Sequence, residues 1–189
     1  MAASEPNLDG ATNILLEEPP IAQGRDTCST LLVEGTPEPD VLFVSYTRRA
    51  ADCVAQIADA QVGAVGVIIV GDSEPDIDDE SVTTDRITTP SDLTGLGIKI
   101  DEYLSTREGP VHVCFDSVTT ALQYVDYQTV YKFVHAMTGK IHAADARAHF
   151  HIDPSAHAEE EVAGLTALFD ARISVEGDDR SVTRRKLIE

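Results

Sequence analysis

Short apolar runs alternate with amphipathic stretches along most of this chain, and this alternation limits the fold more than any other feature. Residues 65–70 are continuously apolar, which is typical of a strand that helices cover on both faces. Residues 128–146 carry apolar side chains at helical spacing. Strands that alternate with helices build a mostly parallel sheet. The sequence therefore predicts an α/β fold in which helices sandwich such a sheet.

The expected elements follow one another in the order of an α/β domain. The expected strands cover residues 13–16, 41–46, 65–70, 87–89, 111–115, 148–152 and 171–175. The expected helices cover residues 27–33, 48–60, 91–107, 128–146 and a segment that opens at Asp153, with Pro154 in its first turn. Residues 71–85 are rich in Asp and Glu, and we expect a solvated loop there.

The chain has 189 residues, a length that fits one domain with one core. We expect a flexible N-terminal lead over residues 1–11, a single domain over 12–176 and a polar C-terminal tail over 177–189. The tail holds a small basic cluster of Arg180, Arg184, Arg185 and Lys186. We expect this cluster to form local ion pairs or to bind an acidic partner.

The formal net charge is −19, with 33 Asp and Glu against 14 Lys and Arg. Binding to nucleic acid or to an anionic membrane relies on basic residues, so we expect neither as a partner. Excess carboxylate with scarce lysine suits a cytoplasm in which molar salt screens the repulsion, and we interpret the chain as halophilic. It has no apolar leader and no stretch long enough to span a bilayer, which predicts a cytoplasmic protein.

The three cysteines are Cys28, Cys53 and Cys114, and no two of them form a C-x-x-C pair. An odd, scattered set of this kind favours small buried hydrophobic side chains over a disulfide framework or a zinc site.

Histidines offer a candidate metal constellation near residue 150. His149 and His151 alternate onto one face of an expected strand, Asp153 continues that face, and His157 follows within a helical turn. The alternative is that the two histidines lie on an exposed or sheet-packed face. We expect no metal, and keep these four residues as the candidate set.

A loop between an expected strand and helix is where α/β proteins bind phosphate, and residues 18–26 form the first such loop. Compared with the pattern G-x-x-x-x-G-K-[ST], Gly24 falls on the second glycine, Arg25 on the lysine and Asp26 on the hydroxyl residue. Only Gly24 matches outright.

An apolar strand that ends in an aspartate occurs at residues 111–117. Strands of this form hold Mg²⁺ in nucleotide hydrolases, so Asp116 and Ser117 are candidate ligand contacts. The alternative is that Asp116 caps the segment that follows.

The amino-acid sequences of several segments resemble those of the KaiC and RadA branch of the RecA-type ATPases. These segments include NILLEEPP, VLFVSYTRR, ITTPSDLTGLGIKI, VHVCFDSVTTALQY and DPSAHAEEEVAGLTALFD. In particular, the chain is similar to haloarchaeal proteins of unknown function built on a degenerate version of that domain. The resemblance implies a RecA/KaiC-like, P-loop-type architecture.

The sequence differs from this family at the positions whose side chains carry out ATP hydrolysis. KaiC-like ATPases end the second strand with two glutamates that activate water, and this sequence has Thr47 and Arg48 there. Neither side chain is a usable base at neutral pH. In the loop, Asp26 would bring a carboxylate to a polyphosphate, and Pro19 and Pro20 lack N–H donors.

Two hypotheses follow from the resemblance and its departures. The first is a non-catalytic pseudo-ATPase that acts as a regulatory or signalling interaction module, with another protein as partner, possible self-association and no cofactor. The second is a divergent enzyme that binds or hydrolyses ATP with Mg²⁺ through Arg25, Asp26 and Asp116. The loss of the glutamate pair favours the first.

Overall fold

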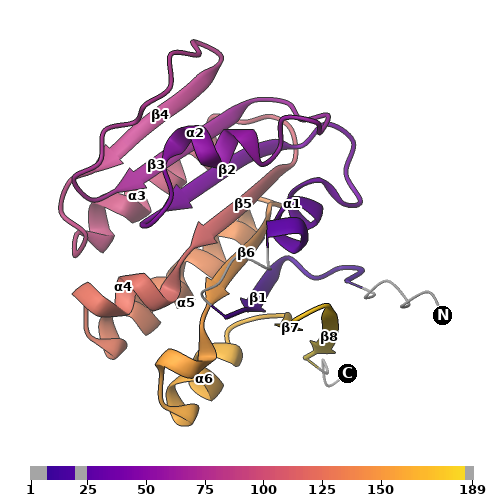
Figure 1. Cartoon of the computed structure of the whole chain (residues 1–189), viewed down its shortest axis with the longest axis vertical. Coiled ribbons are helices and arrows are strands. Elements are labelled where there is room, and N and C mark those ends of the chain that lie inside the picture. Colours follow the sequence, from indigo (N-terminus) through magenta and orange to yellow (C-terminus); the bar gives the residue numbers. More distant parts are fainter. Residues whose placement is uncertain (1–7, 20–24, 186–189) are drawn as a thin grey trace.

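The computed structural model describes residues 8–19 and 25–185, and within these ranges eight strands form one sheet (Figure 1). The strands are β1 (Asn13–Glu17), β2 (Asp40–Ser45), β3 (Val65–Val70), β4 (Val82–Ile87), β5 (Val111–Asp116), β6 (Arg147–Ile152), β7 (Ala171–Glu176) and β8 (Asp179–Arg184). Their order is β4-β3-β2-β5-β6-β1-β7-β8. All neighbouring strands are parallel except β7 and β8. The predicted α/β fold with a mostly parallel sheet is confirmed.

Helices cover both faces of the sheet. They are α1 (Arg25–Val33), α2 (Ala50–Ala55), α3 (Leu93–Ser105), α4 (Val118–Tyr124), α5 (Tyr127–Ala143) and α6 (Glu159–Thr166), with a 3₁₀ turn at Pro154–Ala156. One apolar cluster joins α1 and α2 to the sheet, and the larger cluster joins α3, α4, α5 and α6 to it. Within the described residues, no helix combines the length and apolar character needed to cross a bilayer.

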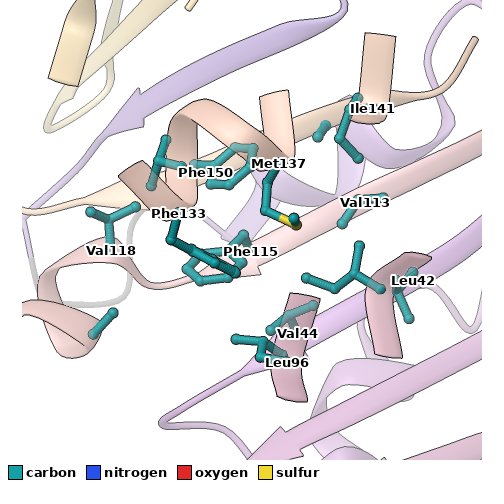
Figure 2. Packing of buried hydrophobic residues seen from close by; sticks show 14 of the residues in the cluster. Leu42, Val44, Leu96, Val113, Phe115, Val118, Phe133, Met137, Ile141 and Phe150 are labelled. Atoms are coloured by element: carbon teal, nitrogen blue, oxygen red, sulfur yellow. The ribbon is translucent and has the colours of Figure 1, made fainter. Parts of the chain in front are cut away.

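The larger cluster is built around aromatic side chains (Figure 2). Phe115 of β5 stacks on Phe150 of β6 with ring centroids 5.1 Å apart, and Phe133 of α5 packs against Phe115 at 6.0 Å. Met137 and Leu96 belong to the same cluster and are labelled in the same view. These contacts hold the end of β5, just before Asp116, against β6 and α5.

Two edge strands differ from the prediction. The expected strand at 87–89 was wrong, because β4 occupies Val82–Ile87 and the acidic loop is correspondingly shorter. The sheet also does not end at residue 175, because β8 pairs with β7 across part of the expected polar tail. Each of these strands has only one neighbour in the sheet, so β4 is only partly buried, β8 is mostly exposed, and both sequences are as polar as a loop.

The ends of several helices also differ from the prediction. Helix α2 is shorter than residues 48–60, because the chain after Ala55 continues in turns with i to i+3 bonds, such as Ile57 N–H to Val54 O at 3.1 Å. Asp153 caps a 3₁₀ turn, and helix α6 begins only at Glu159.

The N-terminal lead is partly in the core. Leu8 and Ala11 are buried and pack with Ile14 and Leu31 in a third apolar cluster. Residues 1–7, which make up most of the expected lead, lie outside the described residues.

The carboxyl ends of β2 and β5 form a topological switch point. After β2 the chain moves through α2 to β3, and after β5 it moves through α4 and α5 to β6, in the opposite direction along the sheet. Ser45 and Asp116 are paired in the register of these two strands. Ligands of open α/β sheets bind at such a point, so the side chains that follow Ser45 and Asp116 form the first candidate site.

Candidate functional site

An ion pair occupies the switch point. Arg48 Nε donates a hydrogen bond of 2.8 Å to Asp116 Oδ2, and the two side chains are only 16% and 17% exposed. Ser45 holds the arginine in place, since its Oγ accepts from Arg48 N–H at 2.8 Å and donates to Arg48 O at 3.0 Å. The carboxylate of Asp116 is therefore engaged by a fixed positive charge.

The same guanidinium makes two further contacts. Its Nη1 donates to Gln56 Oε1 of the turns after α2, and its Nη2 lies 3.6 Å from Cys114 Sγ. Burial alone would lower the pKa of Arg48, but its electrostatic interactions with Cys114 and Asp116 outweigh burial and raise it. Arg48 is thus a permanent cation between the end of β5 and α2.

A cavity of about 320 Å³ lies beside this ion pair. It is lined by Asp26, Ser29, Arg48, Asp52, Ala55 and Gln56. Its lining includes two carboxylates and one guanidinium.

The predicted phosphate-site residues occupy different places. Asp26 lies in the first turn of α1 and faces the cavity. Gly24 lies outside the described residues, as does the side chain of Arg25. Ser117 is the N-cap of α4, and its Oγ accepts from Thr120 N–H at 3.1 Å. Capping is therefore done by Ser117, while Asp116 pairs with Arg48.

A second group of chemically active side chains lies under α1. Cys28 of α1, Cys114 of β5, and His149 and His151 of β6 bring one thiol or imidazole atom each to within 4.8 Å of all the others. Cys28 Sγ is 3.4 Å from Cys114 Sγ and 3.1 Å from His149 Nε2, while Cys114 Sγ is 3.3 Å from His151 Nε2. All four residues are at most 5% exposed.

Charged side chains flank this group on two sides, with Arg48 beside Cys114 and Glu18 beside His151. Glu18 Oε1 contacts His151 Nδ1, the ring nitrogen that faces away from the cysteines. Burial alone would lower the pKa of His151, but hydrogen bonds to Cys28 and Glu18 raise it to about 10. A hydrogen bond from Cys114 lowers the pKa of Cys28, and burial raises the pKa of Cys114.

The predicted histidine constellation is brought together only in part. His149 and His151 lie side by side, with ring centroids 5.1 Å apart. Among the described residues, Asp153 and His157 do not join the group, because Asp153 accepts from Ser155 and His157 Nε2 lies 2.9 Å from Thr119 Oγ1.

Comparison with known proteins places the chain in a family. The sequence profile of a family of unknown function, DUF7504, matches residues 11–175. The chain belongs to this family. No curated protein matches this DUF7504 chain.

Two solved structures from Pyrococcus horikoshii OT3 share the fold of this DUF7504 chain. The structural study of PH0250 gives a TM-score of 0.63 at 12% identity, covering 92% of this chain and 86% of that one. The KaiC-like protein PH0186 gives a TM-score of 0.56 at 12% identity, covering 94% and 80%. At this identity the likeness shows the fold alone, and the predicted KaiC-like architecture is confirmed.

Sequence reasoning treated the cysteines of this DUF7504 chain separately from its histidines. Cys28 and Cys114 are 86 residues apart, so their spacing carries no signal. Cys114 and His149 meet because they pair in the register of β5 and β6, a strand neighbourhood that the sequence does not reveal. Cys53, by contrast, is a buried residue of α2 that does not belong to the group of four ligand atoms, as expected of a small hydrophobic residue.

Proposed function

We propose that this DUF7504 chain is a KaiC-like pseudo-ATPase domain that does not hydrolyse ATP. It acts as a regulatory or signalling interaction module in the cytoplasm of a halophilic archaeon, and its partner is another protein. The observation that carries this proposal is the ion pair between Arg48 and Asp116 at the switch point.

The ion pair removes the magnesium site that the family resemblance implies. Mg²⁺ binds carboxylate oxygens, and one oxygen of Asp116, Oδ2, already accepts a hydrogen bond of 2.8 Å from Arg48 Nε. A guanidinium stays protonated at any physiological pH, so it repels a divalent cation at the same position. Arg48 also follows the strand at the position where the family has its water-activating glutamates, and it cannot accept a proton there.

The charges that line the cavity beside the ion pair support the same conclusion. Asp26 and Asp52 both line the cavity beside Arg48. Two carboxylates in the lining of this cavity would repel a triphosphate, and the single guanidinium in the lining is already paired with Asp116. A domain that keeps the scaffold without these groups acts through its surface. The net charge of −19 favours a protein partner over nucleic acid or an anionic membrane.

Phosphate release from Mg-ATP by the full chain in molar KCl tests the proposal. We expect no release above that of the buffer, for the unaltered protein and for Asp116→Asn alike. Release that Asp116→Asn abolishes and the control Asp145→Asn retains would overturn the proposal. That result would establish the divergent enzyme that uses Arg25, Asp26 and Asp116 with ATP and Mg²⁺. Light scattering of the same sample reports whether the domain self-associates.

A further inference from the structure

We propose that Cys28, Cys114, His149 and His151 bind one Zn²⁺ ion under helix α1. The four residues come from three elements, and nothing in their chain order groups the cysteines with the histidines. This site shares no residue with the Arg48–Asp116 ion pair, although Arg48 contacts Cys114, and the proposal does not depend on whether the domain hydrolyses ATP.

The spacing of the four ligand atoms fits a tetrahedral zinc site. With Zn–S near 2.3 Å and Zn–N near 2.0 Å, neighbouring ligand atoms of a tetrahedron are roughly 3.3–3.8 Å apart. The S–S contact here is 3.4 Å and the two S–N contacts are 3.1 and 3.3 Å. The other three pairs lie within 4.8 Å, so shifts of up to about one ångström bring the four atoms to the corners of a tetrahedron around the ion.

The chemistry of the group also favours zinc. Two thiolates and two imidazoles are a common structural ligand set for Zn²⁺, and sulfur ligands disfavour Mg²⁺ and Ca²⁺. Zn²⁺ binds two thiolates and two neutral imidazoles, so any thiol or imidazolium proton on these four ligands is released to solvent, and Zn²⁺ and the two thiolates sum to zero charge. A neutral unit suits a place where every ligand residue is at most 5% exposed.

A second layer of charged groups holds the ligands in the required orientation. Glu18 binds Nδ1 of His151, which leaves Nε2 directed at the cysteines. A carboxylate behind a histidine ligand is the usual outer partner in zinc sites. Arg48 Nη2 approaches Cys114 Sγ at 3.6 Å and would stabilise a thiolate there.

Four protein ligands close the coordination sphere, so the metal has a structural role. Cys28 lies in α1, which packs on β5, and the other three ligands belong to β5 and β6. Zinc would therefore fasten α1 to the centre of the sheet. Helix α1 is the element that comes after the candidate phosphate loop in the chain.

The first test uses the unaltered full chain. The protein is stripped of metal under reducing conditions and titrated with Zn²⁺ against a chromophoric chelator, which removes ions held weakly by surface carboxylates. We expect about one tightly bound Zn²⁺ per chain. Co²⁺ in the same site is expected to give the intense visible bands of a tetrahedral ion and a sulfur-to-cobalt charge-transfer band. A chain that cannot compete with the chelator, or a Co²⁺ complex without the sulfur band, would overturn the proposal.

Matched variants locate the site. Cys28→Ser is expected to lose the tight site, whereas Cys53→Ser, also a buried cysteine, retains it. Glu18→Gln is expected to bind Zn²⁺ about 10–100-fold more weakly, because the outer partner of His151 is lost. Equal affinity in Cys28→Ser and Cys53→Ser would contradict the assignment. The titration and spectra of the unaltered chain decide the question by themselves, so a variant that fails to fold leaves the test intact.

Discussion

Arg48 and Asp116, which are 68 residues apart, meet at 2.8 Å where two neighbouring parallel strands end. The register that pairs Ser45 with Asp116 brings them together. The same guanidinium reaches Cys114, so one side chain connects the switch point to the proposed zinc ligands. Changes at Arg48 are therefore expected to affect both the ion pair and the thiol behind it.

Arg48→Ala is expected to destabilise the fold by about 2 kcal/mol, because it leaves the largely buried Asp116 carboxylate without its charged partner. Denaturant unfolding at constant high salt measures this change. The adjacent Arg49 is the control, since its side chain is 71% exposed and pairs with Asp76 at the surface. Equal losses in Arg48→Ala and Arg49→Ala would show that the buried ion pair contributes nothing.

Asp170→Ala is expected to lower the free energy of unfolding by about 2 kcal/mol. Its Oδ2 accepts from Thr12 N–H at 3.0 Å, Thr12 Oγ1 at 2.9 Å and Asn13 N–H at 2.9 Å, and these bonds hold the start of β1. Asp178→Ala, at an exposed position, serves as the control. An unfolding midpoint that stays at the unaltered value in Asp170→Ala would refute this account of how β1 is held.

Gly66→Ala and Gly139→Ala are expected to change stability in opposite directions. A Cβ on Gly66 would lie 2.3 Å from a ring carbon of Tyr103, whose hydroxyl is anchored to Val41 O at 2.9 Å. The ring cannot move away cheaply, so Gly66→Ala should cost about 1–3 kcal/mol. Gly139 is exposed within α5 and a Cβ there meets nothing within 4 Å, so alanine should add up to about 1 kcal/mol. Thermal melts of the two variants measured side by side test both signs.

Stability is expected to rise with salt. The net charge of −19 makes the folded chain repel itself, and the Debye length falls from about 10 Å at 0.1 M to about 3 Å at 1 M salt. The free energy of unfolding in urea, measured along a KCl series, should increase across that range. A flat series would contradict the proposed halophilic adaptation.

The central strands were predictable because they are buried on both faces. Residues 65–70 were expected as a strand and form β3 with the same bounds, since continuous apolar character has few other interpretations. The strands β4 and β8 have polar sequences, which are tolerated at the solvent-facing edge of a sheet. Their local patterns therefore predicted an acidic loop over most of β4 and a polar tail at β8. Helix α4 was missed because Val118, Thr119 and Thr120 are β-branched, and Ser117 as N-cap is what starts it.

The candidate sites depend on strand order, which no local pattern contains. Sequence reasoning placed Arg48 and Asp116 at the ends of separate strands, but their contact requires β2 and β5 to be neighbours. Cys28 meets Cys114 only because α1 crosses over β5. The pair His149 and His151 was visible from period-2 alternation, because that relationship lies within one strand.

Titration calorimetry of the full chain with Mg-ATP in molar KCl shows whether the switch point accepts a nucleotide while Arg48 holds Asp116. We predict no heat of binding at ATP concentrations up to about 1 mM, a level that detects interactions of roughly −4 kcal/mol. A saturable heat with micromolar affinity that depends on Mg²⁺ and is lost in Asp116→Asn would contradict this prediction.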